Sequence, residues 1–171
     1  PVDSHRWLII NPGARWTNKR WPVEQFSELI QRLAADHAHL RFAILGGKSE
    51  RDIGRAIAST DTARCLDLTG QTSLPELIEW VRLGELMVTN DTGPMHVAAA
   101  LNKPVIALFG PTRPQHTGPY GQIKQVLQLA LPCVPCMKSY CRLATPLECL
   151  RALPVERVQA EVRVRLGAAG L

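Results

Sequence analysis

The sequence predicts an α/β fold, with helices on both faces of a doubly wound parallel sheet of five or six strands. Short apolar runs alternate with segments of helical periodicity along the chain, and this alternation is typical of βα units. The length of 171 residues and the hydrophobic content of 46% suit one domain with a substantial core. We therefore expect residues 1–171 to form a single domain that binds its ligand beyond the carboxyl ends of the strands.

The strands are predicted from short apolar runs that end at turn-forming residues. These runs are residues 7–11, 41–47, 65–70, 85–90, 104–110 and 125–131. The last run is the weakest, because the pattern loosens after Pro111 into a loop rich in proline and glycine.

Helical periodicity and end signals predict the helices that follow these runs. The predicted helices are residues 23–37, 50–59, 73–81, 94–102 and 154–166. Inward faces are expected at Phe26, Leu29, Ile30 and Leu33 in the first, at Leu74, Leu77, Ile78 and Val81 in the third, and at Val155, Val158 and Val162 in the last. Ser73 and Glu76 have the spacing of a capping box, and Asn102 suits a left-handed helix end.

The charge and hydropathy of the chain limit the kinds of partner and location that we expect for it. Lys and Arg exceed Asp and Glu by 20 to 15, but the basic residues are scattered, so we expect no nucleic-acid partner. The excess fits an anionic ligand and equally an ordinary basic protein. No run approaches the ~20 apolar residues of a membrane helix, and the N-terminus lacks a signal-peptide pattern, so a soluble, cytoplasmic protein is expected. The chain enters its first strand almost at once, which favours a missing N-terminal domain.

The first polar loop, NPGARWTNKRW, follows the first strand. Gly13 allows close approach of the backbone to a ligand, and Lys19 and Arg20 lie just before a helix N-terminus, which favours an anion. This combination predicts a phosphate site. The alternative is a solvated loop in which Trp16 and Trp21 pack locally.

The second polar loop, LGGKSE, follows the second strand. Gly46 and Gly47 allow a tight turn, and Glu50 has the chemistry to accept hydrogen bonds from ribose hydroxyls. The alternative is that Ser49 or Glu50 only caps a helix.

The third polar loop, NDTGPMH, opens the alanine-rich helix. Asp91 or Thr92 can cap this helix, Gly93 removes bulk at the turn, and Pro94 fits the first turn. These structural roles do not explain His96, which is either a ligand-binding imidazole or a buried histidine with its hydrogen bonds satisfied.

Four segments together resemble a known family: NPGARWTNKRWPVEQF, ILGGKSE, LTGQTSLPELIEWV and NDTGPMHVAAALNKPVIALFGPTRPQHTGPYG. They are similar to the C-terminal domain of glycosyltransferase family 9, the heptosyltransferases of lipopolysaccharide core assembly. The resemblance implies a Rossmann-like domain that forms the C-terminal, donor-binding half of a GT-B enzyme. The acceptor-binding N-terminal domain would be absent from this chain.

The resemblance also implies an activity and a location. The full-length protein would transfer heptose, with inversion, from an ADP-heptose-type donor to the lipopolysaccharide inner core, with no required cofactor. It would contact the inner face of the cytoplasmic membrane peripherally. Its carboxylate base would belong to the N-terminal domain, so this chain alone should be inactive. A GT-B-like nucleotide-sugar epimerase and a non-enzymatic nucleotide-binding or metal-sensing module are the alternatives.

Carried onto this sequence, the family pattern and the loop chemistry give one set of substrate-binding residues: Gly13, Arg15, Lys19, Glu50, Thr72, Asp91, Thr92, Gly93 and His96. Lys19 would stabilise the departing diphosphate and is the catalytic residue that we assign. This chain departs from the family at Ala14 and Arg15, where hydroxyl residues are common. Arg15 is expected to take over part of the phosphate contact.

Cysteines gather in a loop at residues 132–149. Cys133, Cys136, Cys141 and Cys149 have the spacing C-x2-C-x4-C-x7-C, while Cys65 stands apart. Reduced thiols and a structural Zn²⁺ site are both open from this spacing, because only the first pair is a C-x-x-C. The segment also resembles the heptosyltransferase II-like branch of the family.

Overall fold

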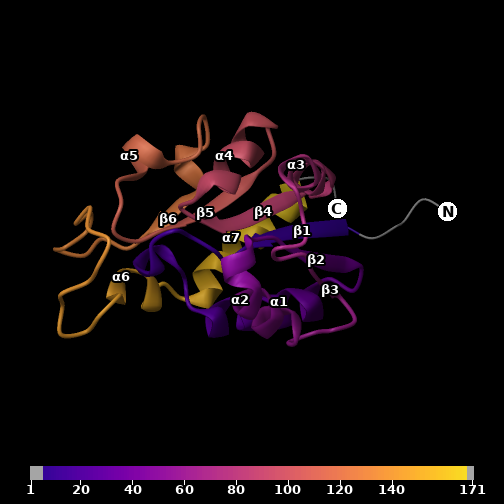
Figure 1. Cartoon of the computed structure of the whole chain (residues 1–171), viewed down its shortest axis with the longest axis horizontal. Helices are drawn as coiled ribbons and strands as arrows, with labels where there is room; N and C mark the ends of the chain where they lie inside the picture. The colour runs from indigo at the N-terminus through magenta and orange to yellow at the C-terminus, as the bar shows by residue number, and fades with distance from the viewer. Residues whose placement is uncertain (1–5, 169–171) are drawn as a thin grey trace.

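The computed structural model describes residues 6–168 and contains a six-stranded parallel sheet (Figure 1). Its strands are β1 (Arg6–Asn11), β2 (Leu40–Ile44), β3 (Cys65–Asp67), β4 (Leu86–Asn90), β5 (Val105–Phe109) and β6 (Val126–Gln128). Each lies parallel to its neighbour in the order β3-β2-β1-β4-β5-β6. The predicted doubly wound Rossmann-like sheet is confirmed, and its strand order reverses between β1 and β4.

Helices cover both faces of this sheet. The helices α1 (Val23–Asp36), α2 (Arg51–Ala58) and α7 (Val155–Ala168) pack on one face, and α3 (Leu74–Leu83) and α4 (Gly93–Ala100) pack on the other (Figure 1). Shorter turns of helix lie in the loops: η1 (Thr17–Lys19), η2 (Lys48–Glu50), α5 (Pro114–Thr117), η3 (Ile123–Gln125) and α6 (Glu148–Arg151). The helix predicted at 50–59 is α2, which begins one residue later because Glu50 ends the η2 turn.

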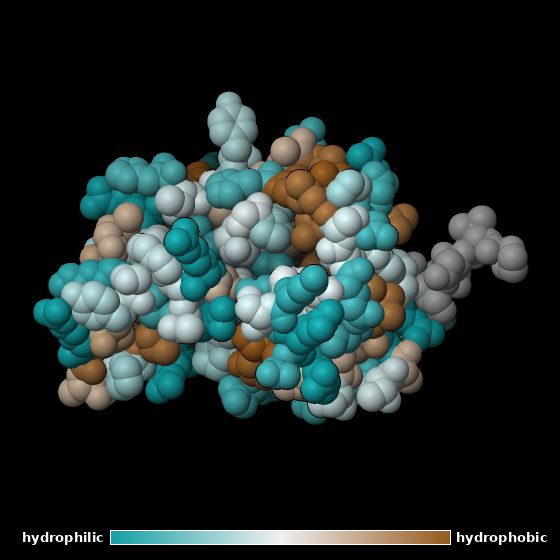
Figure 2. Space-filling model, in the orientation of Figure 1, coloured by the Kyte–Doolittle hydropathy of each residue, from teal (hydrophilic) through white to brown (hydrophobic). Residues whose placement is uncertain are grey.

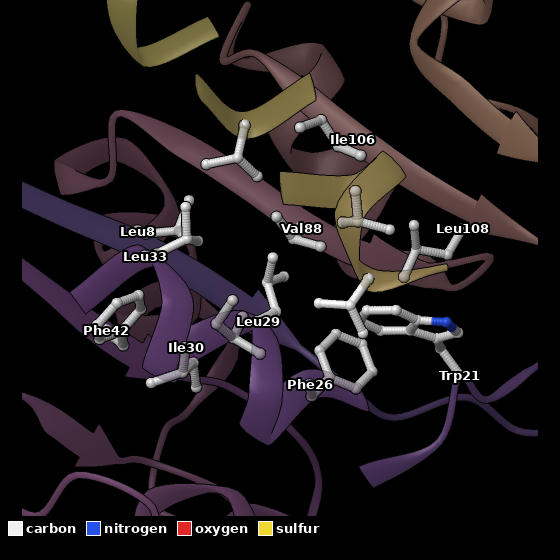
Figure 3. Close-up of a cluster of buried hydrophobic side chains, with 14 of the residues drawn as sticks. Leu8, Trp21, Phe26, Leu29, Ile30, Leu33, Phe42, Val88, Ile106 and Leu108 are labelled. Atoms are coloured by element: carbon white, nitrogen blue, oxygen red, sulfur yellow. The ribbon is translucent and has the colours of Figure 1, made fainter. Parts of the chain in front are cut away.

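The larger core lies between β1, β4, β5 and the helices α1 and α7 (Figure 3). Every predicted inward residue of α1 and α7 is buried: Phe26, Leu29, Ile30, Leu33, Val155, Val158 and Val162. Trp21, just before α1, packs edge-to-face on Phe26 with ring centroids 4.9 Å apart. Each fully buried side chain of this size contributes about 1.5–3 kcal/mol, so this core fixes the loop that contains Trp21.

Helix α3 follows the prediction at its start but not along its whole inward face. The Ser73 N–H and hydroxyl both donate to Oε2 of Glu76, at 2.7 and 2.6 Å, which confirms the predicted capping interaction. Val81 is buried, but Leu74 is 65% exposed, so its predicted inward position is wrong. The face that packs on the sheet includes Trp80, and Leu74 lies a turn before that face.

Leu74 belongs to an apolar patch on the surface of α3. This patch also contains Pro75, Ile78 and Leu83, and its leucine and isoleucine side chains are part of the brown area over α3 in Figure 2.

At the end of α4, Asn102 has a φ of 55°, as its predicted left-handed position requires. No described helix is long and apolar enough to cross a membrane. The N-terminal residues that favoured an upstream domain, residues 1–5, lie outside the described part of the chain.

Candidate functional site at the switch point of the sheet

The loops after β1 and β4 meet where the strand order reverses, and Asn90 joins them. Its buried side-chain amide donates from Nδ2 to the carbonyl of Pro12 at 2.7 Å, and its Oδ1 accepts the backbone N–H of Trp21 at 3.0 Å. One side chain therefore holds both ends of the first loop. Asn90 was not predicted from the sequence, although a polar residue at the end of an apolar strand is a usable signal.

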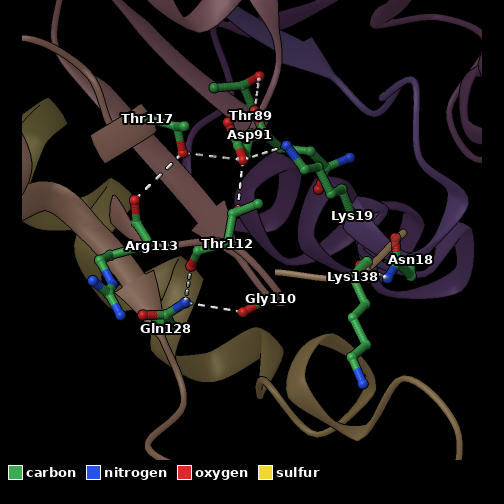
Figure 4. A network of polar contacts seen from close by, with 11 residues as sticks. Asn18, Lys19, Thr89, Asp91, Gly110, Thr112, Arg113, Thr117, Gln128 and Lys138 are labelled. Carbon is green, nitrogen blue, oxygen red and sulfur yellow. Dashed lines mark hydrogen bonds and ion pairs between the residues drawn. The ribbon is translucent and has the colours of Figure 1, made fainter. Parts of the chain in front are cut away.

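Lys19 and Asp91 form the centre of the site (Figure 4). The Lys19 ammonium donates to Oδ2 of Asp91 at 2.7 Å, and it also lies 4.8 Å from the centre of the Trp16 ring. The hydroxyls of Thr112 and Thr117 approach the same oxygen, at 2.6 and 3.4 Å. None of these three contacts uses Oδ1 of Asp91. Because Asp91 is only 6% exposed, these charge-assisted bonds replace the water that it lost on burial.

Strand β6 fixes the loop that supplies Thr112. Nε2 of Gln128 donates to the carbonyls of Gly110 and Thr112, at 2.9 and 2.8 Å (Figure 4). Thr112, Thr117 and Gln128 are site residues that were not predicted from the sequence, although Thr112 ends the segment FGPT. A threonine directly after the glycine and proline that follow β5 was the signal available.

A hollow of about 360 Å³ opens beside Lys19. It is lined by Arg15, Trp16, Lys19, Asp91, Thr92, Gly93, His96 and Thr117. The structure thus brings together six of the predicted residues from the first and third loops. Arg15, Lys19 and the N-terminus of α4 border this hollow, and the one carboxylate in its lining, Asp91, pairs with Lys19. The site therefore suits an anion.

The start of α4 settles two alternatives. Thr92 is its N-cap residue by backbone geometry, while the Asp91 carboxylate is turned to Lys19. His96 is exposed and lines the hollow, so the alternative of a buried histidine is wrong. The buried position in this turn is taken by Met95.

Glu50 and Gly13 contact each other outside the lining of the hollow. Oε2 of Glu50 accepts the N–H of Gly47 at 2.7 Å, which confirms its capping role, and Oε1 lies 3.9 Å from a guanidinium nitrogen of Arg20. A Cβ atom on Gly13 would lie 2.0 Å from Oε1 of Glu50. A side chain at position 13 would therefore displace the carboxylate of Glu50.

The remaining predicted positions are Ala14, Arg15 and Thr72. Ala14 is buried and its carbonyl accepts two bonds from the Arg20 guanidinium, at 2.9 and 2.7 Å. Arg15 is exposed at the hollow, where it can reach an anion. Thr72 is half-buried in the loop before α3 and does not line the hollow. The binding roles of all the predicted site residues stay predictions.

Residues 2–146 match the family model described as glycosyltransferase family 9 (heptosyltransferase). The chain belongs to this family. It is 30% identical over 166 residues to lipooligosaccharide heptosyltransferase 2 of Campylobacter jejuni, covering 94% of this chain and 52% of that protein. It is 34% identical over 134 residues to lipopolysaccharide heptosyltransferase 2 of Escherichia coli, covering 75% of this chain and 38% of that protein.

A solved structure agrees with this family 9 assignment. The E. coli ADP-heptose lipopolysaccharide heptosyltransferase II matches with a TM-score of 0.83 at 27% identity, over 98% of this chain and 48% of that one. The chain thus spans about half the length of the relatives that match along most of it.

The four clustered cysteines of this family 9 chain line a second, smaller pocket of about 140 Å³. Burial, with the nearby thiols of Cys133, Cys136 and Cys141, raises the pKa of Cys149 to about 11. Backbone N–H groups, first that of Leu147, lower the pKa of Cys141. Within residues 6–168, no three His, Cys, Asp or Glu side chains are arranged to hold a metal ion.

The cysteine loop also touches the loops of the first site. Nδ2 of Asn18, next to Lys19, donates to the carbonyl of Lys138 at 2.8 Å. The N–H of Met137 donates to the carbonyl of Pro111, also at 2.8 Å. The loop at 132–149 therefore supports both the Lys19 side and the Thr112 side of the hollow.

Proposed function

We propose that this chain is the donor-binding part of a heptosyltransferase, and that the hollow beside Lys19 binds the diphosphate of an ADP-heptose-type donor. The observation that carries the proposal is the Lys19 ammonium, held by Asp91 at 2.7 Å beside the N-terminus of α4. The family match and the names of the relatives support the same donor. They favour a transferase over an epimerase or a non-enzymatic sensing module.

The site has the chemistry for the leaving group. When the glycosidic bond breaks, negative charge develops on the diphosphate, and donors fixed in advance stabilise that charge. Lys19 supplies one such donor, the first amides of α4 supply others, and Arg15 supplies a second cation at the opening. We assign His96 and Oδ1 of Asp91 to hydroxyls of the sugar.

The ribose and the other end of the donor would lie along the neighbouring loops. We assign the ribose hydroxyls to Glu50, whose Oε1 is not used by the cap to Gly47, and a further contact to Thr72. Gly13 would act by leaving room for Glu50. These assignments follow the edge of the sheet from β1 to β3, where ligands of this fold class bind.

The acceptor half of the reaction needs more than this chain. We infer that an N-terminal domain supplies the general base and the site for the lipopolysaccharide core, because the chain spans about half of its relatives. The full-length enzyme would then act on the cytoplasmic side of the inner membrane, in peripheral contact with it. The present chain should bind the donor without transferring its sugar.

We propose that no cofactor is needed and that the cysteines are reduced thiols rather than a structural zinc site. Zinc quantitation on protein purified without added metal tests this point. A ratio near zero per chain is expected, and one zinc per chain would overturn it.

Calorimetric titration with ADP tests the donor site. Lys19→Ala should weaken ADP binding by about 1–3 kcal/mol, the loss typical of one charge-assisted contact. Lys124→Ala is the matched control, because this exposed lysine lies outside the lining of the hollow. Unchanged affinity in Lys19→Ala, or an equal loss in both variants, would remove Lys19 from the site. No binding of ADP at millimolar concentration would overturn the donor-site proposal itself.

A further inference from the structure

We propose that Thr112 is a positioning residue: its hydroxyl holds the Asp91 carboxylate, and the carboxylate holds the Lys19 ammonium against the anion-binding hollow. The inference deepens the proposed function and rests on it for the identity of the anion. Thr112 is buried and does not line the hollow, so we expect it to act on a ligand through another side chain.

The geometry at Asp91 gives Thr112 the dominant part among the hydroxyls. Oγ1 of Thr112 lies 2.6 Å from Oδ2 of Asp91, whereas the hydroxyl of Thr117 lies 3.4 Å away. Thr112 is only 2% exposed, so water cannot easily take its place. A buried carboxylate that loses a short hydrogen bond either moves toward solvent or binds its remaining partner differently.

Thr112 is itself held from two directions. On one side, Gln128 of β6 donates to the carbonyls of Gly110 and Thr112. On the other side, the N–H of Met137 in the cysteine loop donates to the carbonyl of Pro111 at 2.8 Å. These hydrogen bonds fix the backbone around Thr112, so its hydroxyl is held in one position and can orient the Asp91 carboxylate.

Lys19 is the side chain that needs such orientation. A lysine has a flexible four-carbon stem, and its rotamers must be restricted before its charge can act at a defined place. Asp91, at 2.7 Å, and the Trp16 ring, at 4.8 Å, are its contacts in the site. If Asp91 swings away, the ring alone does not fix the direction of the ammonium, because a cation over a ring is not held at one angle.

The test compares two buried hydroxyls. Thr112→Val removes the hydroxyl that touches Asp91. Thr89→Val removes one that is equally buried in β4 but donates to the backbone carbonyl of Asn90 and accepts from Nδ2 of Asn11. ADP is the probe, because it carries the diphosphate without the sugar that Asp91 itself is proposed to bind. Thr112→Val should weaken ADP binding about 3- to 10-fold, Thr112→Ser should restore it, and Thr89→Val should leave it unchanged.

A double-mutant cycle shows whether the effect passes through Lys19. In the Lys19→Ala background, Thr112→Val should cause no further loss of ADP affinity, because the group that it positions is gone. An equal loss in both backgrounds would show a general structural effect and overturn the proposal. Wild-type affinity in Thr112→Val, or the same weakening in Thr89→Val, would also overturn it.

A ligand-free readout separates this proposal from the donor-site proposal. If the unsubstituted chain binds no ADP, the donor-site proposal fails. The unsubstituted chain, Thr112→Val, Lys19→Ala and the double variant are then compared by urea unfolding instead. Thr112→Val and Lys19→Ala should then shift the unfolding midpoint non-additively, because both act on one carboxylate. Additive shifts, like those expected for Thr89→Val with Lys19→Ala, would reject the coupling of Thr112 to Lys19.

Discussion

Replacing Asn90 with alanine should destabilise the domain by about 2–6 kcal/mol, a large share of the about 5–15 kcal/mol that keeps such a domain folded. The magnitude follows from two hydrogen bonds of a side chain that is fully buried. Without Asn90, the carbonyl of Pro12 loses a donor at 2.7 Å and the N–H of Trp21 loses an acceptor at 3.0 Å. Each buried group left unpaired costs about 1–3 kcal/mol.

Urea unfolding followed by circular dichroism measures this loss, since the midpoint should fall while the slope with denaturant is unchanged. Asn18→Ala is the matched control. Asn18 is also buried, but its Oδ1 has no hydrogen-bond partner among the described atoms, and it makes one bond, to the carbonyl of Lys138. Its replacement should cost less than that of Asn90. A loss of under about 1 kcal/mol in Asn90→Ala, or an equal loss in Asn18→Ala, would refute the view that Asn90 clamps the first loop.

Three further changes test other parts of the structure. Gly13→Ala should weaken ADP binding and lower the unfolding midpoint, because the added methyl group displaces Glu50; unchanged binding would show that the position of Glu50 does not matter. Alkylation near neutral pH, followed by peptide mass spectrometry, should label Cys141 before Cys149, since the pKa is lowered at the first and raised to about 11 at the second; the reverse order would contradict this environment. The pKa of Asp36 is lowered by hydrogen bonds, first from an arginine and then from a glutamine of α7. The ionised Asp36 therefore stabilises the fold above its ordinary pKa of 3.8, and this stabilisation is lost as the pH falls through the lower pKa of the folded state. Asp36→Asn should therefore be less stable than the unsubstituted chain at pH 7, and the difference should vanish in acid; a difference that persists at about pH 2 would argue against this ion pair.

The sequence predicted the α/β class because each local signal agreed with the others. The inward residues of α1 are buried as expected, since an amphipathic helix on a sheet has one face that can leave water. Leu74 shows where the same reasoning fails. Periodicity defines a stripe along a helix, but it does not state how far the sheet beneath that stripe extends, so the first residue of α3 lies exposed.

The candidate site was predicted through its loops rather than through its contacts. Polar residues after parallel strands gather at one edge of the sheet, and this rule correctly joined Lys19 with Asp91 across 72 residues. The rule does not identify the residues that hold them. Asn90 and Thr112 act through hydrogen bonds to groups far away in the chain. Their places after apolar strands mark them as polar residues at the edge of the sheet, but the sequence does not show which groups they contact.

Asp91 shows how the structure changes the interpretation of the third loop. The sequence offered it two roles, as a helix cap or as a ligand for the sugar, and a single carboxylate could not serve both with the same oxygen. In the structure the backbone of Thr92 takes the cap position, and Oδ2 of Asp91 is occupied by Lys19 and Thr112. Its Oδ1 takes part in none of these contacts, while Asp91 borders the hollow. The two oxygens can therefore have separate roles. Oδ2 orients the Lys19 ammonium for the diphosphate, and Oδ1 is available to a sugar hydroxyl. Asp91→Asn would impair both functions at once, whereas Thr112→Val separates them.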